Sequence, residues 1–232
     1  GDKHMIKITR KEDCTGCHGC YNVCPKKCID MNFDEEGFLY PSVDSNKCVE
    51  CGLCEKVCPI IHTVEIENEP IAIGCYNKDE KIRMESSSGG IFTLISELVV
   101  KSGGVVFGAE FDENFNVRHS YVDNIEDLHK FRGSKYFQSN IGDSFRQAKK
   151  FLDDGRKVLF SGTPCQIAGL KSYLNKDYEN LVTVDLICHG VPSPMIWQRY
   201  INELGDGKKL SAMTFRDKSK GWNSGVLKYR FE

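Results

Sequence analysis

Eight cysteines near the start of the sequence repeat one spacing twice. The two runs are Cys14-x-x-Cys17-x-x-Cys20-x-x-x-Cys24-Pro25 and Cys48-x-x-Cys51-x-x-Cys54-x-x-x-Cys58-Pro59. This is the ligand run of bacterial two-cluster ferredoxins, in which the last cysteine of each run ligates the other cluster. The spacing therefore predicts two 4Fe–4S clusters, here called cluster one (Cys14, Cys17, Cys20 and Cys58) and cluster two (Cys48, Cys51, Cys54 and Cys24).

Structural zinc is the main alternative for these cysteines, because a Cys-x-x-Cys pair can also clamp one tetrahedral ion. A third cysteine at the same short interval, followed by Cys-Pro, favours iron–sulfur over zinc. A disulfide scaffold is disfavoured because the rest of the chain is long enough to form a core. Cys28 lies outside both ligand sets and is predicted to be a small buried residue beside a cluster rather than a ninth ligand.

Length and composition favour a two-domain globular protein. The chain has 232 residues, of which 40% are hydrophobic and 28% charged. No apolar run is long enough for a membrane span, no signal peptide opens the chain, and the net charge of -2 argues against a nucleic-acid partner. Twelve cysteines without a secretory signal indicate a reducing compartment, and we expect the cytoplasm of an anaerobe.

The elements around the cysteines predict a ferredoxin-like α+β domain over residues 6–63. A first strand is expected at 6–12, and a hairpin is expected from Ile29–Phe33 and Phe38–Val43 around the turn 34–37. The acidic, patternless stretch 63–70 is interpreted as the domain boundary.

Residues 71–232 alternate strand and helix patterns, which predicts an α/β domain with a mainly parallel or mixed sheet. Strands are expected at 71–76, 105–111, 116–122, 157–160 and 181–187. Helices are expected at 90–101, 125–131, 141–153, 165–174 and 194–204.

A serine–glycine loop precedes the first of these helices and is a candidate anion site. Ser86, Ser87 and Ser88 offer hydroxyls, while Gly89 and Gly90 allow a ligand to approach the backbone at a helix N-terminus. A polar turn that only caps the helix is the alternative. Gly133-Ser134-Lys135-Tyr136 combines a flexible turn with a cation, which could stabilise a reduced flavin or be a solvated loop lysine.

Two more cysteines follow predicted strands in the second domain. Thr163-Pro164-Cys165 places Cys165 in the first turn of a helix, where the helix dipole lowers a thiol pKa. Cys188 and His189 end the next strand, and the carboxyl ends of parallel strands face the ligand crevice of an α/β sheet. Each thiol could be a cluster ligand, a redox thiol or an inert residue, and His189 a structural donor or an acid.

Four motifs in this order resemble the family of coenzyme F-420 hydrogenase/dehydrogenase beta subunits. They are Ser-Ser-Ser-Gly-Gly at 86–90, Gly-Ser-Lys-Tyr at 133–136, Gly-Thr-Pro-Cys-Gln at 162–166 and Cys-His-Gly-Val-Pro-Ser-Pro at 188–194. The resemblance implies a flavin, FAD or FMN, contacted by Ser87, Ser88, Gly89, Gly90, Ser134, Lys135 and Thr163. It also implies that Lys135, Cys165, Cys188 and His189 line the redox site. Family members run past this length, so the sequence is expected to be shortened at its C-terminus.

The expected function is that of an iron–sulfur flavoprotein oxidoreductase. Electrons would pass between the clusters, a flavin and a substrate that takes or gives a hydride, such as a deazaflavin or another conjugated ring. The expected partner is a redox protein or a small electron carrier. The alternatives are a non-catalytic electron-transfer subunit that docks a redox partner and a zinc-stapled interaction module.

Overall fold

The computed structural model describes residues 5–63, 69–222 and 225–232. In the described part of the chain, no helix has both the length and the apolar character needed to cross a membrane. The predicted domain boundary at 63–70 falls partly on residues 64–68, which lie outside the described residues, so it stays a prediction.

Residues 5–63 form a small α+β unit around the cysteine runs. Its hairpin pairs β1 with β2 in antiparallel register from Ile29↔Val43 to Phe33↔Leu39, which confirms the hairpin expected from the sequence. The elements of this unit are η1 (Lys11–Asp13), α1 (Gly19–Val23), β1 (Ile29–Phe33), β2 (Leu39–Val43) and α2 (Leu53–Lys56).

The α/β unit is built on a four-stranded mixed sheet in the order β4-β3-β5-β6. Strands β3, β5 and β6 are parallel, and β4 pairs antiparallel with β3. This confirms the predicted α/β class. The first elements of the unit are α3 (Glu80–Glu85), α4 (Ile91–Lys101), β3 (Val105–Phe111), β4 (Val117–Val122), η2 (Glu126–Phe131), α5 (Ser144–Asp153), β5 (Val158–Gly162), α6 (Pro164–Leu174) and β6 (Leu181–Asp185).

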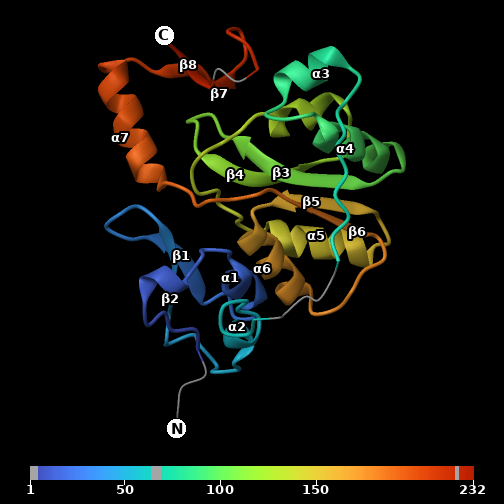
Figure 1. Ribbon diagram of the computed structural model, residues 1–232. Helices are drawn as coiled ribbons and strands as arrows, with labels where there is room; N and C mark the ends of the chain where they lie inside the picture. The colour runs from blue at the N-terminus through green and yellow to red at the C-terminus, as the bar shows by residue number, and fades with distance from the viewer. Residues whose placement is uncertain (1–4, 64–68, 223–224) are drawn as a thin grey trace.

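Alternating side chains of the central strands fill two cores, one on each face of the sheet. Phe107 and Phe160 pack with residues of α5 and α6 on one face. Val106 and Leu159 pack with α4 and η2 on the other. The ferredoxin unit lies on the α5 and α6 side (blue in Figure 1), where α1 packs against both helices. Because successive side chains of a strand point to opposite faces, the pattern of apolar residues places α5 and α6 on the face of the sheet nearer the cysteines.

The last elements form an aromatic layer beyond β4. They are α7 (Pro194–Gly205), β7 (Leu210–Asp217) and β8 (Val226–Phe231), and β7 pairs antiparallel with β8. Trp197 stacks on Phe137 with ring centroids 5.2 Å apart, and Leu210 closes the same cluster.

Two predicted strands are wrong. Residues 6–10 are irregular and residues 11–13 are the 3-10 helix η1, because the Ile6 amide donates to the Cys54 sulfur (3.1 Å) instead of to a neighbouring strand. Residues 71–76 are also irregular and exposed, with Ile71 at 86%. An apolar alternation becomes a strand only where a sheet edge pairs with it.

Candidate redox site

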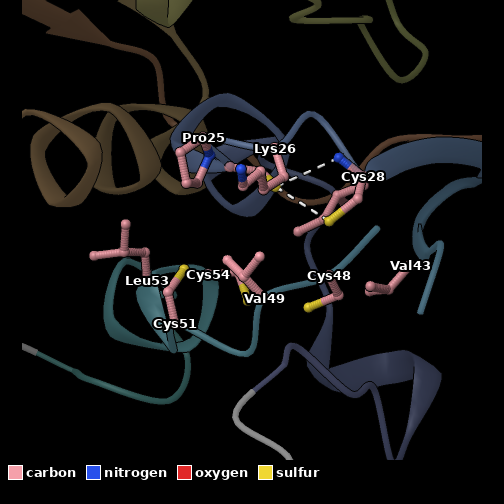
Figure 2. A pocket seen from close by; sticks show the side chains of 11 residues that line it. Pro25, Lys26, Cys28, Val43, Cys48, Val49, Cys51, Leu53 and Cys54 are labelled. Carbon is pink, nitrogen blue, oxygen red and sulfur yellow. Dashed lines mark hydrogen bonds between the residues drawn. The ribbon is translucent and has the colours of Figure 1, made fainter. Parts of the chain in front are cut away.

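The cysteines assigned to cluster two line one cavity in the ferredoxin unit, here called cavity two (Figure 2). Cys48, Cys51 and Cys54 come from the second run, and Cys24 comes from the first. Val49 and Leu53 line the same cavity as apolar walls. The fold therefore places together the four cysteines that the crossed assignment groups, although Cys24 is far from the other three in sequence.

Cys28 also lines cavity two. It is buried, at 3% exposure, and its sulfur lies 3.4 Å from that of Cys24. Burial, together with the neighbouring Cys24 thiol, raises the pKa of Cys28 to about 12. The structure thus places Cys28 as a buried residue beside the expected cluster, and its role as filler rather than ligand stays a prediction.

The other four cysteines line a second and larger hollow, cavity one, of about 290 Å³. Cys14, Cys17 and Cys20 surround it from the first run, and Cys58 reaches it from the second. In the described part of the chain, no three His, Cys, Asp or Glu side chains converge closely enough to share one metal ion. The sulfurs instead lie around the walls of the two cavities.

Burial and backbone amides act on these sulfurs in opposite directions. Burial raises the pKa of Cys17 to about 11 and raises that of Cys20 further, so these thiols would stay protonated without a bound metal. Backbone amides donate to the sulfurs, for example Ile6 to Cys54 (3.1 Å) and Glu50 to Cys48 (3.4 Å). Such hydrogen bonds tune the reduction potential of iron–sulfur clusters. The donor set fits two 4Fe–4S clusters.

The serine–glycine loop and the Gly133–Tyr136 turn meet in the α/β unit. The Ser134 hydroxyl donates to the Ser87 hydroxyl at 2.6 Å. Gly90 is the N-cap of α4 with φ of 78°, and the backbone amide of the buried Asn77 holds the loop by donating to the Gly89 carbonyl (2.7 Å). Two candidate flavin motifs that are far apart in sequence therefore share one surface, while Ser88 is exposed.

Lys218 is a neighbour of this loop that the sequence did not reveal. Its ammonium group donates to the carbonyl oxygens of Arg83 (3.1 Å) and Ser86, and it lies 3.5 Å from the centre of the Trp222 ring. The side chain is buried, and burial lowers its pKa. No motif marks it, because it lies more than a hundred residues after the loop it contacts.

Lys135 is a partly buried cation that backbone carbonyls hold in place. Its ammonium group donates to the carbonyls of Arg132 (3.1 Å) and Gly133 (3.4 Å) and lies 5.4 Å from the centre of the Phe111 ring. Burial lowers the pKa of Lys135 to about 8, and Glu110 offsets part of that effect. A buried ammonium with a depressed pKa is typical of functional sites.

Cys165 lies at the boundary between the two units. Thr163 caps α6 in a capping box with Gln166, and the Cys165 sulfur lies 3.1 Å from the Thr163 hydroxyl. Cys165 is near enough to Cys17 to add to the effect of burial on the pKa of that ligand. The predicted helix start thus carries Cys165 toward cavity one.

Cys188 and His189 lie in the irregular segment after β6. The Cys188 sulfur accepts a hydrogen bond from the Gly190 amide (3.4 Å), and His189 is exposed. Their surroundings therefore differ from those of Cys165, and the meeting of the two thiols at one edge of the sheet stays a prediction.

Two histidines, His18 beside cavity one and His119 on β4, are buried. His18, which lines cavity one, is 2% exposed, and neither of its ring nitrogens has a hydrogen-bond partner. His119 bonds the Ser139 hydroxyl (2.7 Å) and the Ser161 carbonyl (3.0 Å) and stacks on Phe160. Neither histidine has ligand spacing in the sequence, and only the fold brings them to one boundary.

Comparison with known families agrees with this arrangement. Residues 13–60 match the 4Fe-4S dicluster domain. Residues 155–230 match the C-terminal part of the family described as "Coenzyme F420 hydrogenase/dehydrogenase, beta subunit". The chain therefore carries a 4Fe-4S dicluster domain followed by the C-terminal domain of this family of beta subunits. The resemblance stated from the motifs is confirmed.

Curated relatives carry related names. The chain is 24% identical to the F subunit of the F(420)H(2) dehydrogenase of Methanosarcina mazei over 79% of this chain and 55% of the relative. It is 30% identical to the Coenzyme F420-dependent sulfite reductase of Methanocaldococcus jannaschii over 77% of this chain and 28% of the relative. The chain thus spans about half of the first relative and under a third of the second.

A solved structure of the F420-reducing [NiFe] hydrogenase complex from Methanosarcina barkeri also overlaps with the chain. The TM-score is 0.47 at 20% identity, covering 66% of this chain and 57% of that chain. At this level of similarity the overlap carries no argument about the site.

Lys135→Met is expected to raise the free energy of unfolding at pH 7 by on the order of 1 kcal/mol. Burial lowers the folded-state pKa of Lys135 from 10.5 to about 8, so the unfolded chain binds more protons between those values. Wild-type stability contributed by this group therefore rises as pH increases through that window. Methionine has no charge to desolvate, and the variant should lack this rise.

Thermal midpoints of both proteins at pH 7 and pH 10, at one scan rate, measure the effect. Lys101→Met is the matched control, because Lys101 pairs with Glu97 on an exposed helix face. Parallel pH profiles for wild type and Lys135→Met would show that Lys135 is not desolvated.

Proposed function

We propose that this chain is an iron–sulfur flavoprotein oxidoreductase subunit. It would exchange electrons between two 4Fe–4S clusters in the ferredoxin unit and a flavin, FMN or FAD, in the α/β unit. The observation that carries the proposal is that each of the two cavities is lined by all four cysteines of one crossed ligand set. When bound, each cluster would carry one electron at a time, whereas the flavin would carry two electrons and take its protons from water. Two single-electron transfers would therefore supply the two electrons of one hydride transfer.

The residues around the serine–glycine loop support a flavin there. A phosphate would find hydroxyls of Ser87 and Ser134, the N-terminal amides of α4, and the cations Arg83 and Lys218. Lys135, held in place by two carbonyls, could oppose negative charge that develops on a reduced ring. Thr163 would add a hydroxyl at the end of β5, and Cys165 would lie between this unit and cluster one.

The names of the relatives indicate a substrate class. Both refer to coenzyme F420, so a deazaflavin that takes or gives a hydride is the favoured substrate, with a redox protein as partner. A non-catalytic subunit remains the second candidate, since the ferredoxin unit alone would support electron transfer.

The cofactor content of anaerobically purified protein tests the proposal. We expect about eight irons, about eight acid-labile sulfides and one flavin per chain. Zinc in place of iron would overturn the cluster assignment. Full iron without flavin would favour the non-catalytic role in electron transfer.

A further inference from the structure

We propose that cluster one, rather than cluster two, exchanges electrons with the α/β unit, and that Gly169 of α6 is the positioning residue that sets this contact. The inference rests on the proposed function, because it takes the two clusters and a redox group in the α/β unit as present. It adds the order in which electrons pass and the residue that fixes that order.

Gly169 brings the backbone of α6 against a ligand of cluster one. A Cβ atom built at Gly169 would lie 2.9 Å from both the Cβ and the Sγ of Cys17, closer than real Cβ atoms approach. From the other side, a Cβ atom at Gly19 would lie 3.7 Å from the Gly169 carbonyl oxygen. Only glycine at 169 lets α6 touch Cys17 without moving the sulfur.

Polar bonds hold the two units together at the same place. The Arg146 guanidinium on α5 donates to the carbonyls of Tyr21 (2.6 Å) and Asn22 (2.9 Å) on α1. The Asn22 side chain in turn donates to the Gly142 carbonyl (2.9 Å). These bonds hold α1, which contains Cys20, against α5 and α6.

Buried side chains lie on both sides of this contact. His18, which lines cavity one beside Cys17, is 2% exposed, and neither of its ring nitrogens has a hydrogen-bond partner. His119 is also buried, and its ring bonds the Ser161 carbonyl of β5 (3.0 Å). Both cavities are lined by residues of the ferredoxin unit, and Cys17 of cavity one is the expected ligand that the α6 backbone contacts. Electron transfer slows steeply with distance, so the cluster that contacts α6 should dominate.

Gly169→Ala tests the inference in the holoprotein. Alanine is the better helix former, so helix propensity alone would favour the change and any loss reports the contact with Cys17. We expect the midpoint potential and electron paramagnetic resonance signal of cluster one to shift while those of cluster two stay. The rate of flavin reduction by chemically reduced clusters should fall by roughly tenfold or more.

Gly74→Ala is the matched control, because a Cβ atom there meets nothing within 4 Å. If Gly169→Ala does not fold, Arg146→Gln loosens the same interface without adding bulk and should slow flavin reduction at unchanged iron content. Equal shifts of both clusters, or a shifted cluster one with an unchanged rate, would overturn the inference. Wild-type protein without flavin would instead refute the proposed function. In that case the cluster-one signal of Gly169→Ala still tests the contact between Gly169 and Cys17, and an unchanged signal would overturn it.

Discussion

Cys24→Ala is expected to abolish the signal of cluster two and leave cluster one, lowering iron from about eight to about four atoms per chain. The reason is that Cys24 belongs to the first run in sequence but lies in cavity two with Cys48, Cys51 and Cys54. Cys58→Ala should have the opposite effect, because Cys58 lines cavity one. Iron and sulfide analysis, with electron paramagnetic resonance of the reduced protein, measures both outcomes.

Cys28→Ala is the control for this pair. Its thiol lies 3.4 Å from Cys24 and lines the same cavity, yet it is outside both ligand sets. We expect both clusters to survive this change. Loss of the cluster held by Cys14, Cys17 and Cys20 in Cys24→Ala would reverse the crossed assignment, and loss of cluster two in Cys28→Ala would make Cys28 a ligand.

Gly90→Val is expected to abolish flavin binding while both clusters stay. A Cβ atom at Gly90 would lie 3.1 Å from the Cβ of Asn77 and 3.3 Å from the Ser86 hydroxyl, so the branched side chain would push the serine–glycine loop apart. The φ of 78° adds backbone strain of about 1–2 kcal/mol, independent of any ligand. Flavin and iron content of the purified variant are the measurements.

Gly103→Val separates strain from loop damage. Gly103 has nearly the same φ, 79°, but a Cβ atom there meets nothing within 4 Å. The control should therefore lose similar stability and keep its flavin. Equal flavin loss in both variants would mean that the loop has no specific role, and full flavin in Gly90→Val would place the cofactor elsewhere.

Lys135 offers a test of how the protein affects the reduction potential of the proposed flavin. If the Gly90 variant shows that the loop holds a flavin, the midpoint potential of that flavin can be measured in the Lys135→Met protein. This substitution removes a charge and changes the size of the side chain little. The sequence alone left Lys135 open between a flavin partner and a solvated lysine. Its partial burial and its two carbonyl contacts argue against a fully solvated lysine, and its role as a flavin partner stays a prediction.

Local patterns predicted the parts of this protein whose determinants are close in sequence. The hairpin around the turn 34–37, the helix α4 before Gly103 and the β5–α6 unit with its Thr163 cap are all confirmed. Each depends on residues within one or two turns of the chain: a tight turn, a helical period or a capping box. The cysteine spacing likewise grouped the residues that line each cavity.

Only the tertiary structure decided what those elements meet. Residues 6–12 and 71–76 carry strand-like patterns, but strand formation depends on a partner edge that the local sequence does not specify. Gly169, His119 and Lys218 carry no motif, and their roles depend on contacts with Cys17, Ser161 and Ser86, which are distant in the chain. Spacing along the chain can group the ligands of a cluster. Which helix lies against that cluster depends instead on the face of the sheet on which the apolar side chains of that helix pack.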